Sequence, residues 1–124
     1  MRISLAEREA QLMEVLWDRG PSLVNEVQAA LRDELAYTTV LTMLRKLEAK
    51  GYVGHAEEGR AHRYHALIDR GAAREGAISS LVSRLFKGSS EALLLHLVER
   101  EKLSQRQVQR IEEQLRKVSG KEKS

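Results

Sequence analysis

The chain has 124 residues, of which 42% are hydrophobic and 31% charged, so it fits one folded domain with or without a small oligomerisation segment. Its formal net charge is only +3, so the basic residues must be clustered to favour a nucleic-acid partner. Because cysteine is absent, the sequence excludes disulfides, thiolate metal sites and cysteine-based redox sensing. No apolar run has the length of a signal peptide or a membrane span, so we expect a cytoplasmic protein without membrane contact.

The first part of the chain has the order of a helix-turn-helix unit. A capping box at Ser4–Glu7 predicts the start of a first helix, and Gly20-Pro21 predicts its end. Ser22 is expected to cap a short second helix, and a polar turn at 32–35 separates it from a third. The apolar stripe of the first helix, which predicts its buried face, consists of Leu12, Met13, Leu16 and Trp17.

The third helix is predicted from about Thr38 to Lys50, and Gly51 ends it. Its apolar stripe is made of Val40, Met43, Leu44 and Leu47. At about 100° per residue, the other faces carry small hydroxyl residues and cations, not the alternating Glu and Lys of an ordinary solvated face. Small residues let a helix approach base edges, and Thr, Arg and Lys can bond to bases and phosphates. The DNA-contacting residues expected here are Thr38, Thr39, Thr42, Arg45, Lys46 and Lys50.

A two-stranded hairpin is predicted directly after the third helix. Alternating apolar and polar residues flank a turn at 57–60. Arg60 and Arg63 are expected near its tip, within reach of a phosphate or the minor groove. The two glutamates of the turn would oppose DNA there unless they pair with the arginines. A polar-faced helix followed by a basic β-wing predicts a winged helix-turn-helix DNA-binding domain over residues 1–68.

The expected strand pairing places Val53 opposite Tyr64 and His55 opposite His62. Two imidazoles on one face could recruit a metal ion, but without carboxylate or thiolate support they are too few for a closed site, so no metal is expected. No nucleophile–base–acid arrangement and no Gly-rich phosphate loop stands out in the sequence. We therefore expect neither an enzyme nor a bound cofactor.

Apolar stripes at helical spacing continue through residues 69–118, the predicted dimerisation region. Gly88 ends one helix, Ser89 starts a second, and a capping box at Ser104–Gln107 opens a third. Short helices cannot bury these stripes against each other alone, so a two-fold dimer is expected, the alternative being a monomer that packs back onto the winged domain. Residues 119–124 are expected to be a flexible tail. The expected dimer contacts are Ile78, Leu81, Val82, Leu85, Phe86, Leu94, Leu97, Val98, Ile111 and Leu115.

The chain resembles the BlaI/MecI family of penicillinase-type repressors over nearly its whole length. The resemblance rests on LMEVLW in the first helix, TTVLTMLRKLEAKGYV in the third, GRAHRY in the hairpin and LLLHLVEREKLS in the C-terminal part. It implies a mainly α fold with a small β-wing, and a cytoplasmic homodimer that represses transcription at inverted-repeat operators of the TACA/TGTA type in double-stranded DNA. The contact residues that it implies are Thr39, Thr42, Arg45 and Lys46 on the helix, with Arg60 and Arg63 on the wing.

The same resemblance bears on how repression ends. Many family members are cleaved in a C-terminal helix, commonly between Asn and Phe, after a membrane sensor receives a β-lactam. The matching pair here is His96-Leu97, so the resemblance implies a regulatory protease and this cleavage region, with a different pair of residues at the bond. A copper-responsive branch uses cysteine pairs, which this chain lacks.

Two other functions stay open on the residues alone. A winged-helix domain can serve as a protein-interaction module, but the exposed Thr, Arg and Lys of the third helix favour nucleic acid. A small-molecule-responsive regulator would need a ligand site at the dimer seam.

Overall fold

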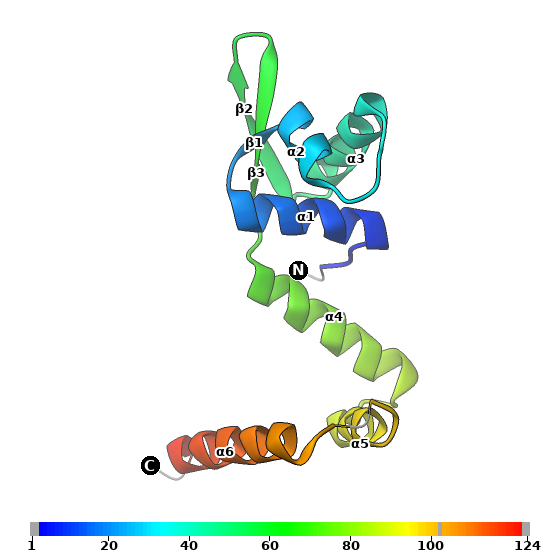
Figure 1. The fold of residues 1–124 in the computed structure, drawn as a ribbon, viewed down its shortest axis with the longest axis vertical. Coiled ribbons are helices and arrows are strands. Elements are labelled where there is room, and N and C mark those ends of the chain that lie inside the picture. Colours follow the sequence, from blue (N-terminus) through cyan, green and yellow to red (C-terminus); the bar gives the residue numbers. More distant parts are fainter. Residues whose placement is uncertain (1–2, 102, 123–124) are drawn as a thin grey trace. The chain divides into compact units, whose positions relative to one another are not determined.

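The computed structural model describes residues 3–101 and 103–122, which form two compact units divided between Ser79 and Ser80. The described chain is a mainly helical winged helix with a small antiparallel sheet and C-terminal helices, which confirms the predicted fold class (Figure 1). In order, the elements are α1 (Glu7–Arg19), β1 (Ser22–Leu23), α2 (Val24–Ala30), α3 (Tyr37–Ala49), β2 (Val53–Glu58), β3 (Ala61–Ala66), α4 (Arg70–Leu85), α5 (Ser90–Arg100) and α6 (Gln105–Glu122).

The core of the first unit lies between α1, α2, α3 and the sheet. Trp17 packs against it, partly buried as expected of a core residue, and its Nε1 donates to the Ile68 carbonyl at 2.9 Å. A core of this kind fixes α3 firmly, since truncating a buried leucine such as Leu44 typically costs about 2–5 kcal/mol. The side chains with at most 2% exposure are Leu12, Met13, Leu16, Val27, Val40, Leu44, Leu47, Val53 and Tyr64.

The start of α1 differs from the prediction. The residue before the helix is Ala6, whose backbone N–H donates to the Glu9 carboxylate at 2.9 Å. Ser4 lies outside the helix, and its backbone N–H donates to the Tyr52 hydroxyl, also at 2.9 Å. The capping box predicted at Ser4–Glu7 is therefore wrong, because a long-range contact holds Ser4 and the acid that reaches back is Glu9.

The sheet contains a third strand that the sequence analysis missed. Its order is β1-β3-β2, with Ser22 paired to Tyr64 and Leu23 to Arg63. Ser22 therefore lies in a strand, and Leu23 precedes α2 in the capping position predicted for Ser22. A strand of two residues is too short to show alternation in a sequence.

The hairpin register differs from the prediction by two residues. Strand β2 continues to Glu58, so the turn holds only Gly59 and Arg60, with Gly59 at a φ of 63°. Glycine with positive φ at the first of two turn positions is typical of tight hairpins, which is why the strands run further than expected. A shift of two residues keeps every side chain on its predicted face. The observed pairs, which replace Val53–Tyr64 and His55–His62, are Val53–Ala66, His55–Tyr64 and Glu57–His62.

Helices α5 and α6 begin where the sequence predicts. The Ser89 hydroxyl accepts from the Ala92 N–H at 3.0 Å, and Ser104 and Gln107 form the expected reciprocal box. Helix α6 continues past Val118, where the helical region was predicted to end, while residues 123–124 of the predicted tail lie outside the described residues. Among the helices in the described ranges, none combines the length and the apolar character needed to cross a membrane.

Candidate nucleic-acid interface

Helix α3 holds its polar side toward solvent. The side chains of Val40, Leu44 and Leu47 are fully buried and anchor the helix on the core. The residues predicted for DNA contact on the other faces are all exposed, namely Thr38, Thr39, Thr42, Arg45 and Lys46. The wing hairpin and α3 belong to the same compact unit (Figure 1).

The Thr42 hydroxyl is already used as a donor. Its Oγ1 donates to the Thr38 carbonyl at 2.8 Å, one helical turn earlier. A threonine held this way still offers an accepting oxygen and its methyl group. Thr42 is therefore suited to accept a hydrogen bond from a base edge or to touch a thymine methyl group, but less suited to donate to a phosphate.

Arg45 lies beside the buried Tyr64 of β3. Burial raises the pKa of the Tyr64 phenol, the charge of Glu48 adds to this, and Arg45 opposes it through its charge and a hydrogen bond. A guanidinium carries five N–H donors in a planar fork. Arg45 is exposed, so its guanidinium keeps donors for a base or phosphate.

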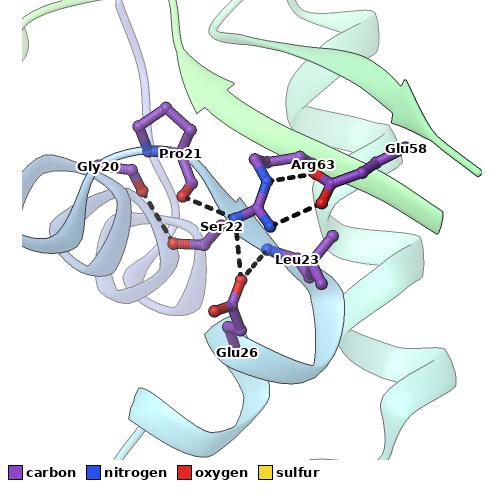
Figure 2. A network of polar contacts seen from close by, with 7 residues as sticks. All are labelled: Gly20, Pro21, Ser22, Leu23, Glu26, Glu58 and Arg63. Carbon is purple, nitrogen blue, oxygen red and sulfur yellow. Dashed lines mark hydrogen bonds and ion pairs between the residues drawn. The ribbon is translucent and has the colours of Figure 1, made fainter.

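Arg63 is held within the protein by two carboxylates (Figure 2). Its Nε and one Nη donate to Glu58 at 2.6 and 3.3 Å, and the other Nη donates to Glu26 at 3.1 Å and to the Pro21 carbonyl at 3.3 Å. These bonds tie β3 to β2 and to the start of α2. Glu58 thus pairs with an arginine, one of the two arrangements that the sequence left open.

The pKa values around Arg63 reflect this network. The hydrogen bond from Arg63 lowers the pKa of Glu58, and the backbone N–H of Leu23, followed by Arg63, lowers the pKa of Glu26. In return, chiefly Glu58 raises the pKa of Arg63. The positive charge of Arg63 is therefore compensated inside the protein, whereas Arg60 lies exposed at the hairpin turn.

Lys50 also has a partner within the protein. Its Nζ lies 2.9 Å from both carboxylate oxygens of Glu9, which is only 3% exposed. Burial alone would raise the pKa of Glu9, but hydrogen bonds from the Ala6 N–H and from Lys50 outweigh it and lower that pKa. The pair joins α1 to the end of α3 and so helps to fix the orientation of α3.

Substitution of Lys50 by alanine should destabilise the fold by about 1–3 kcal/mol, because it leaves a buried carboxylate without its cation. Urea unfolding followed by circular dichroism measures this loss. Lys46→Ala is the matched control: Lys46 is exposed, so its loss should change stability by less than about 0.5 kcal/mol and instead weaken DNA binding. Unchanged stability of Lys50→Ala together with weakened DNA binding would contradict the structural role of Lys50.

The residues predicted for dimerisation lie on α4, α5 and α6, apart from Phe86, which directly follows α4. Helix α5 has no buried residue, and the ring of its exposed His96 lies edge-on to Phe86 with centroids 5.8 Å apart. Val82 is buried within the chain, and Leu81, Phe86 and Ile111 are partly buried. The predicted contacts that remain exposed are Ile78, Leu85, Leu94, Leu97, Val98 and Leu115.

Three helices followed by a β-hairpin, with the third helix exposed beside the hairpin, define a winged helix-turn-helix protein. The profile of the penicillinase repressor family matches residues 5–117. The chain belongs to this family of DNA-binding transcriptional repressors, which are not enzymes.

Individual relatives agree with this assignment. The chain is 39% identical over 100 residues to the transcriptional regulator BlaI of Mycobacterium tuberculosis, covering 77% of this chain and 72% of that protein. It is 21% identical over 119 residues to the methicillin resistance regulatory protein MecI of Staphylococcus aureus, covering 94% of each. The monomeric form of Bacillus licheniformis BlaI, solved in complex with the blaP half-operator, is 30% identical with a TM-score of 0.50 and covers 58% of this chain and 90% of its own.

Proposed function

We propose that this protein is a cytoplasmic repressor that binds an inverted-repeat operator as a homodimer. The observation that carries the proposal is the exposed row of threonines and cations on α3, in the same compact unit as an exposed arginine at the wing turn. The relative solved with a DNA half-operator supports double-stranded DNA as the partner. In this proposal, residues 1–68 bind DNA and residues 69–118 dimerise.

The proposed contacts divide into base reading and backbone positioning. Helix α3 enters the major groove, where Arg45 donates to a base and Thr42 meets a base edge, with Thr38, Thr39 and Lys46 around them. Arg60 reaches the backbone or minor groove from the wing. Lys50 and Arg63 support the scaffold through Glu9 and Glu26 and are left out of the proposed contact.

The dimer is proposed to form through the apolar side chains of α4, α5 and α6. Apart from Val82, the described hydrophobic side chains from Ser80 onward are exposed or only partly buried, which disfavours a stable unit made by one copy alone. A two-fold partner would cover them and set two α3 helices about 34 Å apart, in successive major grooves. Binding there would block access to a promoter.

Repression would end when the dimer weakens or is cut. His96 and Leu97 are both exposed on α5, which is consistent with access by a regulatory protease. The bond between them lies inside a regular helix, so cleavage would require local unfolding of α5.

Selection of binding sites from random DNA tests the operator proposal. We expect the enriched sequences to be inverted repeats whose half-sites lie about one helical turn apart, or a whole number of turns. Enrichment of a single half-site would contradict the dimer, and no enrichment would contradict sequence-specific binding.

Substitution of Arg60 by alanine should weaken binding to every DNA sequence alike and reduce the slope of log affinity against log salt by about one unit, because one phosphate contact is lost. Anisotropy titrations at several salt concentrations measure the slope. Arg84→Ala, which removes an exposed arginine from α4, is the matched control and should leave the slope unchanged. An unaltered slope for Arg60→Ala would place the wing away from the DNA backbone.

A further inference from the structure

Three side chains with metal-binding donors gather on one face of the wing. His55 and Glu57 share a face of β2 because strand side chains alternate, and Glu57 pairs directly with His62 of β3. One donor atom from each of these residues lies within 4.8 Å of the other two. The imidazole rings of His55 and His62 stack with their centroids 4.3 Å apart and their planes 10° apart.

The sequence analysis discounted a metal here because two histidines had no carboxylate beside them. That argument used the wrong hairpin register. The observed register moves Glu57 directly opposite His62 and so supplies the missing oxygen ligand on the same face. Histidine with carboxylate is a donor set found in three-ligand zinc sites.

A fourth residue, Glu48, contacts His55 in the arrangement common at metal-binding histidines. A carboxylate oxygen of Glu48, in the last turn of α3, lies 2.6 Å from His55 Nδ1. Metal-binding histidines usually donate their second ring N–H to a carboxylate or carbonyl, which fixes the tautomer and makes the other nitrogen a better ligand. With Nδ1 held by Glu48, Nε2 is the nitrogen of His55 that can bind an ion.

We propose that His55, Glu57 and His62 bind one divalent transition-metal ion, with Glu48 orienting His55. Imidazole ligands favour zinc, copper and nickel, whereas magnesium and calcium prefer sets made only of oxygen. Ligands about 2.0–2.2 Å from zinc lie roughly 3.3–3.6 Å apart, so the three side chains must draw together on binding. They stand on a hairpin face that is at most partly buried, where side-chain rotation can supply this movement.

The ion would also change the charge of the wing. It would neutralise Glu57, which is exposed close to the hairpin turn, and add positive charge to the face that adjoins the end of α3. The proposed site is built entirely within the first unit. The proposal of a metal site therefore depends neither on the operator nor on the dimer.

Calorimetric titration of the chelator-treated full chain with zinc chloride tests the site without DNA. We expect one ion per chain, at least about tenfold weaker binding for His62→Ala, and about 10–100-fold weaker binding for Glu48→Gln. His65→Ala is the matched control, because His65 is on the same strand but the opposite face, and it should bind zinc like the parent. Circular dichroism verifies that each variant is folded.

A second measurement locates the ion. In a titration with copper(II), the ring signals of His55 and His62 in an NMR spectrum should broaden before those of His65 and His96. Equal zinc affinity of His62→Ala and the parent, broadening that begins at His65 or His96, or no zinc binding by the parent at about 100 µM would each overturn the proposal.

Discussion

Replacing Leu97 with aspartate should convert the protein to a monomer and lower its affinity for an intact operator by a factor on the order of 10²–10⁴, the gain that linked half-sites provide. Leu97 is 39% exposed within one chain and lies on α5, which has no buried residue, so the substitution should spare the fold of the chain itself. At a dimer interface the same charge would be buried without a partner, which is costly.

Sedimentation equilibrium and anisotropy with operator DNA measure the two effects of Leu97→Asp. The matched control is Leu67→Asp, since Leu67 is 58% exposed but lies before α4, outside the proposed interface. The control should remain a dimer with parental affinity. If Leu97→Asp still sediments as a dimer, this face of α5 does not hold the subunits together.

Substitution of Arg45 by alanine should cost about 1–3 kcal/mol of operator affinity and relax discrimination at one base pair of each half-site. Arg45 is exposed on α3, so the donors of its guanidinium are accessible to a base. A phosphate contact would instead lower the affinity for all sequences equally.

The measurement for Arg45→Ala is the affinity for a set of operators that carry each base at each position. Arg84→Ala on α4 is the matched control for the lost charge and should keep the parental base preferences. A uniform loss of affinity would move Arg45 to the DNA backbone, and an unchanged profile would remove it from the contact.

Local sequence patterns predicted the helices of this fold well. The stripe of Val40, Leu44 and Leu47 repeats at helical spacing over thirteen residues of α3, and all three side chains are fully buried. The box at Ser104 and Gln107 was also confirmed, because both partners lie within four consecutive, solvent-exposed residues.

The errors arose where distant residues decide the structure. Ser4 had the pattern of a cap but is held by Tyr52, 48 residues away, and Ser22 pairs with Tyr64 in the sheet. The hairpin register depended on whether the turn held two or four residues, which the alternation of strand residues does not resolve.

The candidate site was predictable where it depends on a local pattern, and not where it depends on distant residues. The exposed face of α3 follows from the position of its apolar stripe, so the exposure of its threonines, Arg45 and Lys46 was predicted without a structure. Lys50 and Arg63 were predicted from their places on the third helix and near the hairpin tip, whereas Glu9 and Glu26, which bind them, lie 41 and 37 residues away in the sequence. The pairing of Arg63 with Glu58 was one of the alternatives that the sequence left open, but only the folded chain reveals the bonds to Glu9 and Glu26.

The measurement that tests the central claim most directly is fluorescence anisotropy of the purified protein with two DNA duplexes of equal composition. One duplex carries a TACA/TGTA inverted repeat, and the other carries the same bases in scrambled order. At about 150 mM salt, we expect the inverted repeat to bind at least roughly 10³-fold more tightly. Equal, weak and salt-sensitive binding to both duplexes would contradict specific recognition of this operator.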